Sequence, residues 1–140
     1  MTQPEFPRRF VVACALIERD GRLLAARRKE GGVFSGKWEF PGGKVEDGET
    51  PEECVVREVV EELGMLVEIL FPLTPAFHRY PSLEVTIYPF VSRIVSGEIV
   101  RNVHDAISWV QPQQMESLDW LEADRPILRE YRSRLEKMGR

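Results

Sequence analysis

The chain has 140 residues, 43% hydrophobic and 30% charged, with a formal net charge of −4 at pH 7. This length suits one domain with a buried core, which we expect over residues 1–140. The acidic balance argues against a nucleic-acid partner, and no apolar run reaches the ~20 residues of a membrane span. Neither a secretory signal nor a disulfide framework is visible, so we expect a cytoplasmic protein.

The first half of the chain predicts a hairpin, a loop and a helix. An apolar run over residues 9–17 indicates a buried strand, and a turn at Asp20-Gly21 leads to its partner over 22–27. A loop is expected over 29–37, and a short extended piece follows at 38–40. Further along, Thr50 can cap a helix, with Glu53 completing a capping box, and Gly64 is placed to end that helix.

The second half predicts further strands and a last helix. The strands are expected over residues 65–70, 83–95 and 107–110, with a helical turn over 112–117. Pro89 indicates a bulge or an edge position in the second of these strands. Asp124 is expected to cap a helix that runs from about residue 125 to 137. Mixed strands with two main helices predict an α+β or α/β sandwich.

Residues 43–65 carry the most informative pattern. On a helix, Glu58, Glu61 and Glu62 fall on one side, opposite an apolar arc. Like charges at this spacing cost a helix roughly 0.2–0.5 kcal/mol per pair. The cluster therefore favours a divalent cation among the carboxylates, because Mg²⁺ prefers oxygen ligands. Taken alone, a solvated acidic helix face is the alternative interpretation.

The same stretch resembles the Nudix box. The matching positions are Gly43, Glu49, Arg57, Glu58, Val59, Glu61, Glu62, Gly64 and Met65. The segment KWEFPGGK at 37–44 resembles the MutT-type branch of that family, and residues 8–28 and 104–130 fit the branch more loosely. The resemblance implies the Nudix fold, an α/β/α sandwich in which a mixed sheet lies between helices.

The resemblance also implies a reaction and its metal ligands. MutT-type members convert a nucleoside triphosphate to the monophosphate and pyrophosphate. Glu58 and Glu62 are the implied main ligands of Mg²⁺, for which Mn²⁺ can substitute. Glu61 is expected to be a ligand or to hold a water, and the Gly42 carbonyl is a further oxygen. Such ions clamp phosphate oxygens and lower the pKa of a bound water.

Two more residues of the box are assigned to catalysis. Arg57 is expected to orient the glutamates by pairing with Glu49. A surface pair between Arg57 and Glu61 is the alternative, worth only a few tenths of a kcal/mol.

Substrate contacts are implied at residues before and after the glycine turn at residues 41–43. Arg28 stands where the branch places an arginine that faces the nucleotide, and Phe40 is expected to line the base pocket. Lys44 and Lys37 are candidates to face phosphates. Trp38 is expected to pack in the core, because alternation along a strand sends it opposite to its neighbour.

Asp124 bears on the choice of base. The 8-oxoguanine-selective members carry an asparagine here, whereas an ionised aspartate only accepts hydrogen bonds and pairs with the exocyclic amine of cytosine. At this position the chain is more similar to enzymes that act on CTP, dCTP and 5-substituted dCTP. We therefore expect (d)CTP or a modified pyrimidine nucleotide as substrate. Base reading and helix capping can hold together at Asp124.

One position departs from the branch. A loop glutamate commonly lies six residues before the tryptophan of the late strand, and that position is Val103 here. Of the two residues that follow, Asp105 is the better cation ligand, and His104 is expected to be a polar loop residue. We rank Glu61 or Glu58 ahead of Asp105 as general base.

Three functions remain open on the sequence. The first is a Mg²⁺-dependent pyrophosphohydrolase of (d)CTP, the second an 8-oxo-dGTP sanitising hydrolase, and the third a catalytically silent nucleotide-binding sensor. The complete set of box residues argues against the third. We expect no nucleic-acid or membrane partner, and either a monomer or a homodimer.

Overall fold

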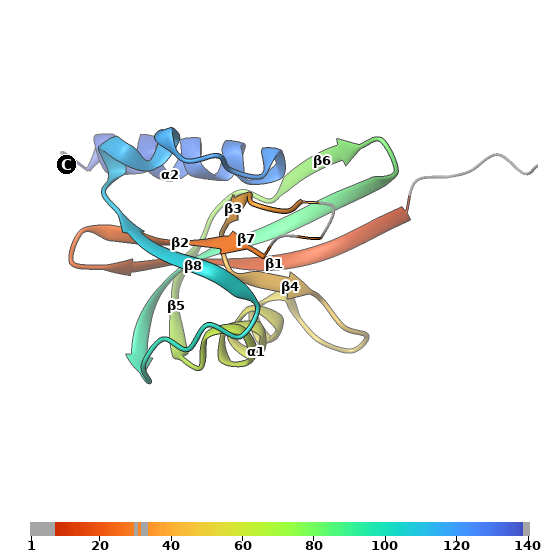
Figure 1. Ribbon diagram of the computed structural model, residues 1–140, viewed down its shortest axis with the longest axis horizontal. Helices are drawn as coiled ribbons and strands as arrows, with labels where there is room; N and C mark the ends of the chain where they lie inside the picture. Colours follow the sequence, from red (N-terminus) through yellow and green to blue (C-terminus); the bar gives the residue numbers. More distant parts are fainter. Residues whose placement is uncertain (1–7, 30, 32–33, 139–140) are drawn as a thin grey trace, which may run out of the picture.

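The computed structural model describes residues 8–29, 31 and 34–138. In this part of the chain an eight-stranded mixed sheet lies between two helices, as Figure 1 shows. The strands are β1 (Arg8–Arg19), β2 (Arg22–Arg28), β3 (Trp38–Glu39), β4 (Gly42–Lys44), β5 (Leu66–Pro72), β6 (Ala76–Tyr80), β7 (Leu83–Ser96) and β8 (His104–Val110). The helices are α1 (Pro51–Leu63) and α2 (Arg125–Lys137), and two 3₁₀ helices precede α2, η1 (Pro112–Ser117) and η2 (Glu122–Asp124). The predicted α/β/α sandwich is confirmed.

The long strands β1 and β7 form the centre of the sheet. They pair in parallel from Arg8 opposite Leu83 to Glu18 opposite Arg93. On its other side β1 pairs with β2 near their shared turn and with β4 further along. A Cβ on Gly42 of β4 would lie 2.0 Å from the Ala13 carbonyl oxygen, so only glycine permits this approach. The approach fixes the start of the loop that leads into α1.

Each face of the sheet carries its own hydrophobic core. The α1 face takes the odd-numbered residues of β1, and the α2 face takes the even-numbered ones, as expected for a strand that is buried on both sides. The first core contains Ala13, Ala15, Ile17, Cys54, Val55, Val59 and Leu63. The second contains Cys14, Leu16, Phe40, Trp120, Ile127, Leu128 and Tyr131.

The helix termini confirm one capping prediction and correct another. At α1, Thr50 Oγ1 accepts from the Glu53 N–H at 3.1 Å, the Glu53 side chain accepts from the Thr50 N–H, and Gly64 ends the helix at φ 69°. At α2, Asp124 stands at the N-cap position but makes no capping hydrogen bond. Its carboxylate turns inward and accepts from the Phe40 N–H, so the predicted cap is wrong.

The strand predictions also need correction. Strands β4 and β6 were not expected, because two glycines open β4 and β6 is a five-residue run with His78 and Arg79 at its centre. Pro89 lies in an interior strand, contrary to the expected edge or bulge. On the side of β7 away from β1, β6 pairs as far as Ile87 and β5 pairs from Phe90 onward, so Pro89 stands between two partners. The missing N–H of proline therefore breaks no ladder there.

Among the described residues, no helix combines the length and the apolar composition needed to cross a membrane.

Candidate active site

Helix α1 presses one glutamate against the glycine turn. A Cβ on Gly43 would lie 2.4–2.6 Å from the carboxyl atoms of Glu58. The absent side chain is therefore what lets the Glu58 carboxylate lie over the backbone of β4. This contact places the acidic face of α1 beside the segment that resembles the MutT type.

Arg57 is the cation of the acidic cluster. Its Nε and Nη2 donate to the two carboxylate oxygens of Glu49 at 2.7 and 3.0 Å, and its Nη1 donates to Glu58 at 2.9 Å and to Glu61 at 3.1 Å. Hydrogen bonding to Glu49 is the main cause that raises the pKa of Arg57, and the same bond lowers the pKa of Glu49 to about 2. The surface pair with Glu61 exists, but it is one contact of a network that orients three carboxylates.

Among the described residues, no cation pairs with Glu62 in this way. Burial, and then the nearby charges of Glu39 and Glu58, raise the pKa of Glu62 well above its ordinary value, against a hydrogen bond from the Gly42 backbone. Its Oε2 is buried without a hydrogen-bond partner in the described part of the chain. An orphaned oxygen among carboxylates is the environment that a hard cation neutralises.

The donor set fits a cation that is shared with substrate. No group of three or more His, Cys, Asp or Glu side chains in the described ranges converges as a ready-made metal cage. Mg²⁺ usually keeps several waters and takes one or two carboxylates together with substrate phosphates. The carboxylates of Glu58 and Glu62 suit this kind of open site, and the Gly42 carbonyl stays a predicted further ligand.

A cavity of about 300 Å³ begins at the glycine turn and brings the four predicted substrate residues together. Its lining includes Arg28, Phe40, Lys44 and Asp124. The Phe40 ring is buried and packs on Trp120 with centroids 4.7 Å apart. The Arg28 guanidinium donates to Glu39 at 3.1 Å, and the Lys44 ammonium lies 3.9 Å from the centroid of the Phe10 ring. The four residues predicted to bind substrate thus line one cavity.

Two other candidates lie elsewhere. Lys37 does not line this cavity and pairs with Asp119 at 2.9 Å. Trp38 is half-buried and packs against the core on the α2 face, as predicted.

Asp124 differs from the expected ionised acceptor. It is 4% exposed, and burial, followed by the charge of Glu39, raises its pKa to about 8. The hydrogen bond from the Phe40 N–H, at 3.2 Å, and the charge of Arg28 only partly offset this. The side chain is therefore mostly neutral at pH 7, with one donor and one acceptor to offer.

Val103 is the position that departs from the branch. The two residues that follow it, His104 and Asp105, are both bound by other side chains. Val103 is exposed, and Asp105 Oδ1 accepts from Arg27 Nε at 2.7 Å. His104 is not a polar loop residue as expected. It opens β8, is 2% exposed, and its Nε2 lies 2.8 Å from Glu39 Oε2.

Sequence reasoning missed both Glu39 and His104 as site residues. Glu39 lines the cavity, and the signal for it was available in the strand alternation that sends it opposite to Trp38. No local signal marks His104, because its partner lies 65 residues away along the chain.

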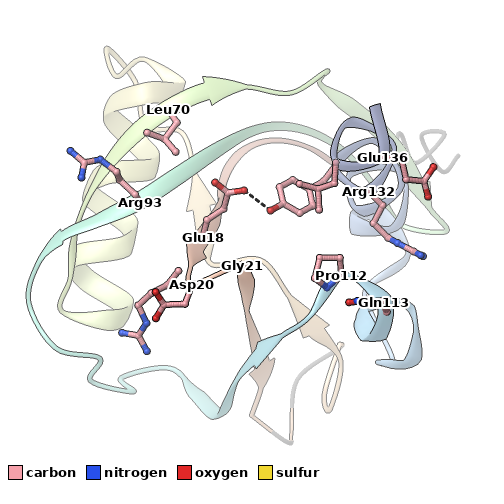
Figure 2. Close-up of a pocket in the computed structure, with 12 residues that line it drawn as sticks. Glu18, Asp20, Gly21, Leu70, Arg93, Pro112, Gln113, Arg132 and Glu136 are labelled. Atoms are coloured by element: carbon pink, nitrogen blue, oxygen red, sulfur yellow. Dashed lines mark hydrogen bonds between the residues drawn. The ribbon is translucent and has the colours of Figure 1, made fainter. Parts of the chain in front are cut away.

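A larger cavity, about 610 Å³, lies at the other end of β1. Figure 2 shows its lining, where the Tyr131 hydroxyl donates to Glu18 Oε2 at 2.5 Å, with Asp20 and Gly21 of the hairpin turn nearby. None of the predicted site residues lines it. Size alone therefore does not identify the active site here.

Comparison with known proteins agrees with this geometry. The NUDIX domain model matches residues 7–131. The chain is 30% identical over 120 residues to the CTP pyrophosphohydrolase of Escherichia coli K12, covering 86% of this chain and 89% of that protein. It is 32% identical over 117 residues to the putative 8-oxo-dGTP diphosphatase 2 of Mycobacterium tuberculosis H37Rv, covering 82% of each. The crystal structure of the MutT protein from Methanosarcina mazei Go1 matches with a TM-score of 0.81 at 27% identity, over 94% of this chain and 97% of that one. The chain therefore belongs to the Nudix family, as a MutT-like nucleotide pyrophosphohydrolase.

Proposed function

We propose that the chain hydrolyses (d)CTP, or a modified pyrimidine nucleoside triphosphate, to the monophosphate and pyrophosphate. The observation that carries this proposal is the continuity of the cavity with the acidic cluster. The cavity holds Phe40 and Asp124 in its wall and also reaches Gly43, over which the Glu58 carboxylate lies. A base against Phe40 would leave its phosphates beside the glycine turn, Lys44 and the carboxylates of α1.

Glu58, Glu62 and the Gly42 carbonyl are the groups that would hold Mg²⁺ or Mn²⁺, with Glu61 as a further ligand or as the holder of a water. When bound, such an ion neutralises phosphate charge and acidifies water. The forked bond from Arg57 to Glu49 keeps the guanidinium in place, and Arg57 in turn orients Glu58. General-base work falls to Glu61 or Glu58.

The cytosine preference is supported by Asp124 and by the similarity to a CTP pyrophosphohydrolase. While neutral, Asp124 can complement either the amine of cytosine or the carbonyl of uracil. Above its pKa of about 8 it becomes an acceptor only, which binds the cytosine amine and repels the uracil oxygen at the same place. The preference for cytosine should therefore grow with pH.

A second candidate substrate is 8-oxo-dGTP. A neutral carboxyl has a donor and an acceptor, as does the asparagine that the resemblance places here in 8-oxoguanine-selective enzymes. The raised pKa of Asp124 is the specific observation in its favour, together with the similarity to a putative 8-oxo-dGTP diphosphatase.

The test incubates the protein and Mg²⁺ with CTP, dCTP, 5-methyl-dCTP, UTP, dTTP or 8-oxo-dGTP. Pyrophosphate release is measured from about pH 6.5 to about pH 9. We expect a cytosine nucleotide to be cut fastest, with a CTP-to-UTP ratio of kcat/KM that rises through about pH 8 and becomes flat in Asp124→Asn. An advantage of 8-oxo-dGTP above about tenfold would reject the cytosine assignment. Absence of pyrophosphate release from every triphosphate would reject the reaction.

A further inference from the structure

Glu39 is held by two donors at the wall of the nucleotide cavity. Its side chain is 13% exposed and accepts from Arg28 Nη1 at 3.1 Å through Oε1 and from His104 Nε2 at 2.8 Å through Oε2. Its charge contributes to the raised pKa of both Glu62 and Asp124. The Glu39 carboxylate therefore lies within electrostatic reach of both the metal end and the base end of the site.

The two donors differ in how firmly they can hold Glu39. The Arg28 side chain is 44% exposed, so water competes for its donors. His104 is buried, and its ring is brought into place by a register shift between β2 and β8, where Arg27 pairs with Ala106 but Arg28 pairs with His104. Irregularities of this kind re-aim side chains beside active sites.

Only one of the two nitrogens of the His104 ring has a hydrogen-bond partner among the described residues. Nδ1 is buried and has no hydrogen-bond partner among the described residues. A carboxylate only accepts, so the proton of the contact with Glu39 belongs to Nε2. Burial of a polar ring with one nitrogen unpaired is unfavourable on its own. The one hydrogen bond that the ring makes in the described part of the chain is therefore the contact that explains its place.

We propose that His104 is a positioning residue that holds the Glu39 carboxylate against the nucleotide cavity and acts on nucleotide binding through Glu39 alone. This inference rests on the proposed function, because it takes a nucleotide as the occupant of the cavity. Without His104, Glu39 would keep only the exposed Arg28 as donor, and an ion pair that water competes for holds a carboxylate in one place only weakly.

The first test compares His104→Leu, which removes the donor, with His104→Gln, whose amide can replace Nε2. Losing a buried hydrogen bond to a charged group should raise KM for the best triphosphate about tenfold to a hundredfold in His104→Leu, with kcat changed less than about threefold. His104→Gln should recover most of that loss. Ser108→Ala, on the same strand and outside the cavity lining, is the matched control and should leave both constants unchanged.

The second test is a double-variant cycle with Glu39→Leu, which has no acceptor. If His104 acts through Glu39, adding His104→Leu to Glu39→Leu should not raise KM further, since the contact is already lost. Additive effects of the two substitutions would overturn the proposal. So would a His104→Leu variant in which kcat and the melting temperature fall together while KM is unchanged, which is the signature of a merely structural role.

A third readout needs no turnover and separates this proposal from the proposed function. The chain has two histidines, so the ¹⁵N signals of His104 and His78 can be assigned directly. We expect the Nε2–H tautomer at His104, a change in its signals on Glu39→Leu, and an unchanged His78. Titration of the same variants with CMP would follow binding. A wild-type chain that cleaves no triphosphate would reject the function, whereas an Nδ1–H tautomer at His104 would reject the positioning role.

Discussion

Replacing Asp124 by asparagine should stabilise the protein, and by more as the pH rises. The carboxyl is 4% exposed, and its pKa is about 8 against an ordinary 3.8. Because the folded-state pKa is raised, the folded chain keeps a proton that the unfolded chain releases above about pH 4. Below that pH, Asp124 does not lower the free energy of unfolding. As the pH climbs towards about 8, the buried carboxyl lowers the free energy of unfolding progressively.

The size of the effect follows from the same numbers. The difference of 4.2 pKa units (8 − 3.8) corresponds to at most about 6 kcal/mol, at about 1.4 kcal/mol per unit. Asparagine keeps an acceptor for the Phe40 N–H but must bury an amide group, which costs about 1–3 kcal/mol if it finds no partner. We therefore expect a gain of about 3 kcal/mol at pH 8, or roughly 10 °C in melting temperature, and little or no gain near pH 4.

Thermal melts of both proteins across this pH range are the assay. Asp119→Asn is the matched control, because its carboxylate is 64% exposed and lies in the segment just before η2. That control should change melting temperature by a small amount that does not grow with pH. A difference in melting temperature between Asp124→Asn and the parent that does not grow with pH would refute the reasoning.

Four further outcomes are expected. Glu58→Gln and Glu62→Gln should each lower turnover by at least about a hundredfold with little change in melting temperature, and retention of most activity by both would remove the metal assignment. Arg57→Lys should lower kcat about ten- to a hundredfold, because an ammonium cannot form the fork to Glu49 while it holds Glu58; a wild-type rate in stopped-flow assays would contradict this. The rate should rise towards alkaline pH, as a deprotonated base requires, and an optimum below about pH 6 would exclude the mechanism. Asp105→Asn should keep full turnover, because Arg27 binds that carboxylate, whereas a large loss in steady-state assays would make Asp105 the general base.

Local signals carried the sequence predictions that the structure confirms. Thr50, Glu53 and Gly64 lie within one helix and define its two ends by short-range contacts. The apolar run of β1 is buried on both faces, so it is continuous and easily recognised. Strand β4 gave no such signal. It pairs only because glycines tolerate the approach to Ala13 and Cys14, which residue-type preferences do not encode.

The errors at the site share a different cause. The side chain of Asp124 takes its environment from Phe40 and Glu39, both more than 80 residues earlier in the chain. Its inward turn and its neutrality follow from that packing, whereas the sequence around it indicates only a helix start. His104 was misplaced for the same reason, since only the fold brings Glu39 to its ring. Packing between residues far apart in the chain thus sets the environment of these side chains, whereas the local sequence pattern sets the backbone conformation.

The charge balance of α1 explains how the cluster can exist before any ion binds. One guanidinium contacts the carboxylates of Glu49, Glu58 and Glu61, so these three share the positive charge of Arg57. Glu62 shares none of it and buries an unpartnered oxygen instead. An uncompensated buried charge costs several kcal/mol, so the fold meets this cost by raising the pKa of Glu62. A divalent cation bound there would supply the missing charge at that oxygen, and the Arg57 network would hold Glu58 in place to receive it.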